Sequence, residues 1–269
     1  MNQKYGILCV LLLLVASCFF VGCTGQSGNE QTDESVDLLV YCGAGMREPM
    51  EEVAEAYTAK TGNSINYNFG GSNTLLSQME LIEQGDVYMP GATSYFDAAQ
   101  KKGFVEESNL VCYHIPVIIT PKDNPADIQT LEDLGKEGIM IELGDPKACA
   151  IGKLSNKIIE KNKLNESIYP NVVTRSATVN ELVLHTALGQ VDGAICWEDL
   201  ANSDEMEVIY IPNNQNIVKI VPVGSLTFSE NPEQAQEFVD FVASDEGLAI
   251  FAKQGFTTYP NDKYADVTL

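Results

Sequence analysis

The sequence predicts an α/β protein of two lobes, each built on a mixed, mostly parallel sheet flanked by helices, with two chain crossings between the lobes. Short apolar runs alternate with amphipathic helical patterns from residue 37, and this alternation restarts near residue 120. Helical patterns return after residue 230, so we expect the chain to cross back into the first lobe. The predicted first lobe is 37–115 plus 223–269, and the predicted second lobe is 116–222.

The first lobe begins with a strand that is expected to be buried. Residues 37–42 form an apolar run, which the glycines at positions 43 and 45 break. Apolar residues then recur at helical spacing from Met46 to Tyr57, which predicts an amphipathic helix. A strand over 65–69, a helix over 75–82 and a strand over 87–89 complete a βαβαβ order. Such an order is typical of a parallel, doubly wound sheet.

The second lobe repeats this order after a crossover strand at 115–120. Its expected elements are a short helix at 130–134, a strand at 138–143, a helix at 149–161, a strand at 172–173, a helix at 178–188 and a strand at 191–196. A strand at 217–223 leads back to the first lobe. Helices at 232–243 and 245–252 follow it.

The N-terminal segment predicts export and a lipid anchor. Residues 1–22 combine a weakly basic start with a long apolar run, as in a signal peptide. Gly22-Cys23 resembles a lipoprotein processing site, so Cys23 is the expected lipidation site; Cys18 is an alternative, and an uncleaved anchor is another. Residues 23–36 are expected to be the lipidated N-terminus and a flexible tether. Each alternative places the protein on the outer face of the cytoplasmic membrane or in the periplasm.

The net charge of −22 limits the possible partners. Nucleic acid is excluded as a partner for so acidic a surface. An anionic ligand would have to be held by short-range N–H and O–H donors, because salt screens long-range repulsion over roughly 8–10 Å. Four cysteines lie in the expected globule, each beside an apolar run and none in a C-x-x-C pair: Cys42, Cys112, Cys149 and Cys196. We expect buried free thiols, with disulfides as the alternative.

Strand-to-helix junctions rich in small residues are the candidate binding elements. They are Gly43–Met46, Gly70–Asn73, Lys147–Gly152 and Ser176–Val179. The start of a helix offers N–H groups without acceptors and a favourable dipole, which suits an anion. Taken singly, each junction is more simply interpreted as an ordinary turn followed by a helix cap. Matching junctions in both lobes, at the carboxyl ends of strands, favour a cleft between the lobes.

Other residues offer weaker signals, and none predicts catalysis. His114 and His185 have no carboxylate at a suitable spacing, so core or surface positions are expected for both. The single tryptophan, Trp197, is expected either to line the cleft or to pack in the core. Glu198 and Asp199 are expected to be surface acids, with extra ligands to a metal centre as the alternative. No hydrolase, P-loop or zinc-protease motif occurs, so we expect no enzyme and no cofactor.

The junctions resemble those of the molybdate-binding proteins of ABC importers, a class of periplasmic-type solute-binding proteins. The segments "LLVYCGAGMREPMEEVAEAYTAKTG" and "YNFGGSNTLLSQMELIEQGDVYMPGA" are similar to the family's first two units. "HIPVIITPKDNPADIQTLEDLG" and "NPEQAQEFVDFVASDEGLAIFAKQGF" are similar to its crossover and C-terminal helices. The likeness covers most of residues 38–258 and implies a periplasmic-binding-protein-like fold.

The resemblance also implies a set of ligand-binding residues. It places a hydroxyl donor at Ser72 and backbone donors near Ile151 and Val179. Two positions depart from the family: Gly45 stands where the family has Ser, and Cys196 stands where it has Tyr. Gly45 keeps its N–H, and the indole of Trp197 could replace the lost Tyr donor. Met46 and Asn73 adjoin these positions and are further candidates.

The expected function is therefore capture of a tetrahedral oxyanion, molybdate or tungstate, by a monomeric receptor. The receptor would deliver it to an ABC permease and its ATPase, and the only metal would be that of the oxyanion. The alternatives are a receptor for sulfate-like anions, an organic solute or iron, and a sensor that serves a signalling protein. Iron receptors of this class use paired tyrosines, which are absent here.

Overall fold

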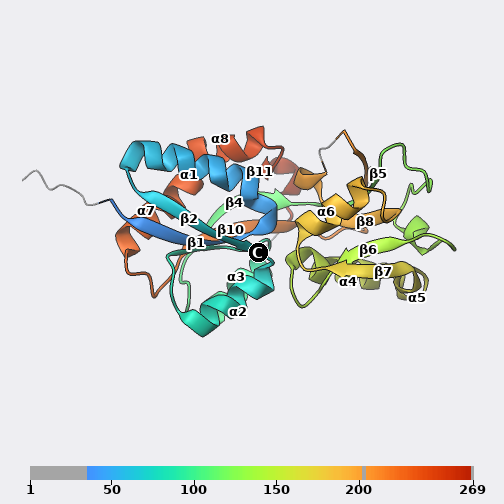
Figure 1. The fold of residues 1–269 in the computed structure, drawn as a ribbon, viewed down its shortest axis with the longest axis horizontal. Helices are drawn as coiled ribbons and strands as arrows, with labels where there is room; N and C mark the ends of the chain where they lie inside the picture. The colour runs from blue at the N-terminus through green and yellow to red at the C-terminus, as the bar shows by residue number, and fades with distance from the viewer. Residues whose placement is uncertain (1–34, 202–203, 268–269) are drawn as a thin grey trace, which may run out of the picture. The chain divides into compact units, whose positions relative to one another are not determined.

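The computed structural model describes residues 35–201 and 204–267 (Figure 1). The expected signal peptide, the lipidation site Cys23 and all but the last two residues of the tether lie outside the described residues. Within the described ranges, no helix is long and apolar enough to span a membrane.

The first sheet has six strands in the order β11-β4-β10-β3-β1-β2. Their bounds are β1 Asp37–Gly43, β2 Ser64–Gly70, β3 Val87–Met89, β4 Asn109–His114, β10 Lys219–Ser225 and β11 Thr257–Thr258. β1 pairs in parallel with β2 and β3, whereas β10 pairs antiparallel with β3 and β4. β1 is therefore an inner strand, which explains why residues 37–42 read as a continuous apolar run.

Helices cover both faces of the first sheet (Figure 1). One core contains side chains from α1 (Arg47–Thr61), α7 (Pro232–Val242) and α8 (Asp245–Lys253). The core on the opposite face contains α2 (Ser72–Ile82) and α3 (Thr93–Lys101). The C-terminal helices thus pack with the N-terminal one, because the chain returns through β10.

The second sheet has five strands in the order β7-β6-β8-β5-β9. Its strands are β5 Pro116–Pro121, β6 Ile141–Gly144, β7 Val172–Ser176, β8 Gly193–Trp197 and β9 Met206–Tyr210. The helices here are α4 Ala150–Lys161, α5 Asn165–Ile168 and α6 Val179–Ala187. Short 3-10 turns are η1 Ala44–Met46, η2 Glu132–Gly135, η3 Tyr169–Asn171, η4 Glu198–Leu200 and η5 Asp262–Tyr264.

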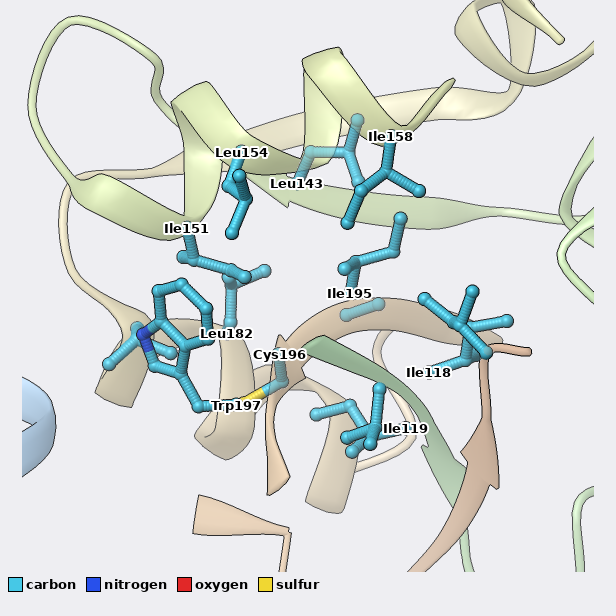
Figure 2. Packing of buried hydrophobic residues seen from close by; sticks show 14 of the residues in the cluster. Ile118, Ile119, Leu143, Ile151, Leu154, Ile158, Leu182, Ile195, Cys196 and Trp197 are labelled. Atoms are coloured by element: carbon cyan, nitrogen blue, oxygen red, sulfur yellow. The ribbon is translucent and has the colours of Figure 1, made fainter. Parts of the chain in front are cut away.

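Aliphatic side chains from the sheet and from α4 and α6 form the core of this second unit. Figure 2 shows Ile195 in its middle, Ile118 and Ile158 on one side, and Ile151 and Trp197 on the other. Ile151 and Trp197 also line the functional site described below. Packing of this apolar surface is the main source of stability for the unit.

Both sheets are mixed, and the two-lobed α/β prediction is confirmed at that level. The expectation of mostly parallel sheets is wrong: parallel pairing is limited to β2-β1-β3 and β7-β6-β8. The strands beside the crossovers, β5 and β10, pair antiparallel with their neighbours. The strand β10 begins at Lys219, so it crosses the lobe boundary expected at residues 222 and 223.

Among the described residues, five helices and strands were not predicted from the sequence: α3, α5, β4, β9 and β11. The expected helix at 130–134 is a shorter 3-10 turn over 132–135. Cys42, Cys112, Cys149 and Cys196 are buried and free, as predicted.

Candidate functional site

A small pocket lies where loops of the two sheets meet. Its lining residues are Gly43, Ala44, Gly45, Met46, Gly70, Gly71, Ser72, Gly91, His114, Cys149, Ala150, Ile151, Thr178, Val179 and Trp197. The cavity volume is about 20 Å³, counted as the space open to the centre of a water-sized sphere. One water requires roughly 10–15 Å³ by that measure, so in this arrangement of the loops the free space corresponds to one or two water molecules.

The pocket lies at the beginnings of helices from both sheets. Ser72 is the first residue of α2, Ala150 and Ile151 open α4, and Val179 opens α6. Gly45 lies in the turn η1 that leads into α1. In each case a strand ends at or near small residues and the chain turns directly into a helix. The positive ends of several helix dipoles therefore point to one place.

Several amides of the lining have no partner. Among the described residues, no hydrogen-bond acceptor is found for the N–H groups of Gly45, Ser72, Ile151 and Val179. The first residues of a helix cannot be satisfied within the helix itself. By contrast, the N–H of Thr178 is bound to Glu181 in a capping box. Unpaired N–H groups are costly when buried, so these four amides form a donor set for a guest.

The hydroxyl of Ser72 is also available as a donor. Its Oγ accepts a hydrogen bond of 2.9 Å from the N–H of Gly91, and no acceptor for its own hydrogen is found in the described part of the chain. The carbonyl oxygen of Gly91 is in turn 2.8 Å from Nδ1 of His114. A carbonyl oxygen only accepts, so Nδ1 carries the hydrogen. Gly91 thus links the His114 imidazole to the Ser72 hydroxyl.

The lining carries no carboxylate and no Lys or Arg. Burial lowers the pKa of His114 to about 4, so the imidazole is uncharged near neutral pH. Burial likewise raises the pKa of the Cys149 thiol to about 11, so it stays protonated. The site can therefore offer neutral hydrogen-bond donors and helix ends to a guest. Within the described ranges, no cluster of His, Cys, Asp and Glu could hold a metal ion.

The structure brings most of the expected site residues to this pocket. Gly45, Met46, Ser72, Ile151, Val179 and Trp197 all line it. Asn73 and Cys196 do not line it. The Asn73 side chain donates to the Lys147 carbonyl at 2.6 Å, and Cys196 is fully buried in the second core.

Nine of the described lining residues were not among the expected ligands, and three of these nine carry a polar side chain: His114, Cys149 and Thr178. Cys149 and Thr178 lie inside junctions that the sequence did single out. His114 was expected to lie in the core or on the surface. It does end a buried strand, β4, but its ring also stacks on Trp197 with centroids 4.4 Å apart and reaches the pocket. Only the pairing of β4 with β10 brings it there.

Both histidines lie close to carboxylates that are distant from them in the sequence. His114 Nε2 lies 3.9 Å from Oδ1 of Asp199. His185 Nδ1 lies 2.9 Å from Oε2 of the fully buried Glu142, which also accepts from Ser176. Asp199 was expected on the surface or at a metal centre; instead it is 8% exposed, and no metal cluster surrounds it in the described part of the chain. Each pair joins residues from elements distant in sequence, so spacing along the chain could not reveal it, although His114 lies in the core as expected.

Comparison with protein families adds an independent finding. Residues 38–257 match the model of the bacterial extracellular solute-binding protein family. The chain is 30% identical over 225 residues to a putative binding protein of Haemophilus influenzae, with 83% of this chain and 91% of that protein covered. It is 22% identical over 254 residues to the molybdate-binding protein ModA of Mycobacterium tuberculosis, covering 92% and 95%.

Solved structures with the same fold bind different solutes. The molybdate-binding protein of Azotobacter vinelandii superposes with a TM-score of 0.69 at 16% identity, covering 82% of this chain and 98% of that one. The sulfate-binding protein SubI of Mycobacterium tuberculosis gives 0.75 at 15% identity, covering 87% and 92%. AfuA of Actinobacillus pleuropneumoniae, with fructose-6-phosphate bound, gives 0.72 at 18% identity, covering 84% and 85%. At these identities the likeness shows the fold and leaves the ligand open.

Proposed function

Because this chain belongs to the bacterial extracellular solute-binding protein family, we propose that it captures a small tetrahedral oxyanion and delivers it to an ABC permease. Molybdate or tungstate is the proposed cargo, held by the amides of Gly45, Ile151 and Val179 and by the amide and hydroxyl of Ser72. We propose that the two lobes are residues 37–115 with the chain from β10 onward, and residues 116 to the start of β10, so that the boundary expected at residues 222 and 223 moves to Lys219. Members of the family bind solutes, so the protein performs no chemistry on its cargo.

The observation that carries the proposal is the donor set itself. Four unpaired amides and one hydroxyl come from the beginnings of helices on both sheets, and no carboxylate lies in the lining. Neutral donors and helix dipoles hold a dianion without the desolvation cost of a buried cation. This also answers how a protein of net charge −22 can hold an anion, since only short-range donors act inside the pocket.

The size of the pocket favours an oxyanion over a sugar phosphate. A cavity of about 20 Å³ is too small for a ligand such as fructose-6-phosphate in this arrangement of the loops. Neutral donors serve sulfate and molybdate alike, so discrimination between them depends on the cavity size. Met46 and Trp197 border the same space and set its limits.

Thermal unfolding of the purified protein with molybdate, tungstate, sulfate, phosphate or nitrate tests the proposal. A ligand at a thousandfold excess over its Kd adds about 4 kcal/mol of stability. For a domain of this size, that free energy corresponds to a rise in Tm of roughly 10 °C. We expect this rise with molybdate or tungstate. A rise only with sulfate or phosphate would contradict the choice of cargo, and no rise with any oxyanion would contradict the function.

Lipid attachment at Cys23 completes the proposal and places the receptor, as a monomer, at the outer face of the cytoplasmic membrane. A curated relative that is 23% identical over 263 residues is described as a putative substrate-binding lipoprotein of Bacillus subtilis. Cys23→Ser should move the protein from the membrane fraction to the soluble fraction. Cys18→Ser is the matched control, and release by that variant instead would assign the anchor to Cys18.

A further inference from the structure

His114 and Asp199 form an isolated buried pair beneath the pocket. The side chains are 1% and 3% exposed. Among the described residues, His114 Nε2 and Asp199 Oδ2 are the buried side-chain polar atoms with no hydrogen-bond partner. Their separation, 3.9 Å from Nε2 to Oδ1, is too long for a hydrogen bond. Unpaired buried polar atoms are rare and call for a functional explanation.

The pair reaches the pocket through one chain of contacts. Asp199 faces Nε2 of His114, whose Nδ1–H donates to the Gly91 carbonyl, and the Gly91 N–H donates to Ser72 Oγ. The same imidazole stacks on Trp197, which also lines the pocket. The position of Ser72 thus depends on how His114 holds Gly91.

Counting protons fixes the charge of the pair. Nδ1 holds one proton because it donates to a carbonyl. If that is the pair's only proton, Nε2 and the carboxylate both accept and the pair carries one negative charge. With a second proton, on either Nε2 or the carboxyl group, the pair is neutral and one group can donate to the other. A third proton would make it cationic.

We propose that His114 and Asp199 act as a positioning pair, which holds Gly91 and Ser72 in place and couples capture of a dianion to the second proton. This inference rests on the proposed function. A buried negative charge at Asp199 would repel a dianion in a pocket that contains no cation to offset it. The dianion therefore binds while the pair is neutral, and its affinity falls once Asp199 loses its proton.

Burial supports the neutral form. It raises the pKa of Asp199 well above its usual value, and the neighbouring Glu198 raises it further. It lowers the pKa of His114 to about 4, so a third proton is excluded near neutral pH. A second proton on the pair is therefore held by the carboxyl group of Asp199 rather than by Nε2 of His114. The bound dianion should raise the pKa of Asp199 further, because its negative charge favours the uncharged carboxyl group.

The groups around the pair do not account for the proposed pH dependence in its place. Cys112 and Cys196 face Asp199, and burial, followed by the Asp199 charge, raises the pKa of both thiols. His114 packs on Trp197 and Phe256, which do not titrate. The charged groups that share the hollow on the other side of Asp199 are Glu48, Glu205 and Lys253.

The dissociation constant as a function of pH tests the pair. Sulfate and molybdate stay doubly charged at neutral and alkaline pH, so their affinity should fall about tenfold per pH unit above the pKa of Asp199 in the unliganded protein. Titrations from about pH 6 to about pH 10 should show this fall in the wild type and none in Asp199→Asn. The matched control is Asp97→Asn, an exposed carboxylate on α3, which should keep the wild-type profile. Identical profiles for the wild type and Asp199→Asn would overturn the proposal.

The positioning role has its own test. His114→Asn keeps an N–H that can reach the Gly91 carbonyl, whereas His114→Leu has none. We expect His114→Leu to bind molybdate at least about tenfold more weakly than His114→Asn, and neither to show the pH dependence. Equal affinities of the two variants would show that His114 does not act through Gly91.

Fluorescence separates failure of this inference from failure of the proposed function. Trp197 is the only tryptophan and stacks on His114, so its emission should titrate with the pair in protein without ligand. Asp199→Asn should abolish that titration, and Asp97→Asn should keep it. If no oxyanion binds but this difference is present, the pair exists and the cargo is wrong. If Asp199→Asn titrates like the wild type, the pair itself is refuted.

Discussion

The backbone of Gly71 lies against the carbonyl oxygen of Ala148, so closely that a Cβ at Gly71 would come within 2.4 Å of that oxygen. Gly71 precedes α2 beside the first sheet, and Ala148 precedes α4 beside the second. The same carbonyl accepts a hydrogen bond of 3.1 Å from the N–H of Asn73. Contacts between main-chain atoms thus bring the two halves of the pocket together, and a side chain at position 71 would prevent them.

Gly71→Ala should weaken ligand binding by at least about tenfold. The φ of −68° and ψ of 140° suit alanine, so the backbone of the first lobe is not strained. The methyl group would instead clash with Ala148 and with the Ala177 carbonyl at 2.8 Å, and hold the lobes apart. Isothermal titration calorimetry with molybdate measures the effect. Gly193→Ala on β8 is the control, since position 193 does not line the pocket and its Cβ would meet the Ile128 side chain at 3.0 Å. Equal losses in both variants would contradict the explanation.

Ser72→Ala should weaken oxyanion binding about 10- to 100-fold. A hydrogen bond to a charged group contributes about 1.5–3 kcal/mol, and the variant also leaves the Gly91 N–H without its acceptor. Ser229→Ala is the matched control, because its hydroxyl donates to Asp86 and does not line the pocket. Affinities of the two variants for molybdate should differ clearly. If Ser72→Ala binds molybdate as tightly as the wild type, Ser72 does not contribute to the site.

Acidification should destabilise the protein through His114. Its pKa in the folded state is about 4, compared with about 6.5 in an unfolded chain. Above about pH 6.5 neither state binds the extra proton. As the pH falls from there to about 4, the unfolded state binds a proton that the folded state does not bind. The free energy of unfolding therefore falls by about 3 kcal/mol in total. Urea unfolding at about pH 7.5 and about pH 4.5 should show a smaller fall for His114→Gln than for the wild type. An equal fall would contradict the assignment.

His185→Ala should lower the free energy of unfolding by about 1–3 kcal/mol. It leaves the buried Glu142 carboxylate with Ser176 as its remaining recorded side-chain partner. The estimate is below that for a fully buried pair because the His185 side chain is 34% exposed. Glu142→Gln with His185→Ala should recover part of the loss, since no buried charge remains. If the double variant is no more stable than His185→Ala, the charge of Glu142 is not the cause.

Lysines beside the pocket should accelerate anion capture. Lys153, Lys157 and Lys219 line a hollow that shares Ala150 with the pocket. Lys153→Glu should lower the association rate of molybdate about three- to tenfold at low salt and leave the dissociation rate unchanged. Stopped-flow fluorescence of Trp197 measures both rates, and the difference should vanish at high salt. Lys101→Glu, an exposed site on α3, controls for the change in net charge. The same slowing in both variants would exclude local steering.

Local patterns in the sequence were enough to predict the fold and much of the site. The apolar run of residues 37–42 and the helical spacing after Met46 correspond to β1 and α1. The junctions at Ser72, Ile151 and Val179 were found because glycine and small polar residues between a strand and a helix have a direct structural meaning. Strand direction was less accessible, because pairing of β10 with β3 and β4 joins residues more than a hundred positions apart.

The sequence by itself therefore determined that helices begin at small residues in both halves of the chain, and that an anionic ligand would have to be held by short-range N–H and O–H donors. Only the tertiary structure decided that Gly71 and Ala148 touch, that Cys196 faces the core, and that His114 meets Asp199. The physical reason is that caps and amphipathic faces depend on neighbours along the chain. Burial and the pairing of titratable groups depend on which distant strands pack together.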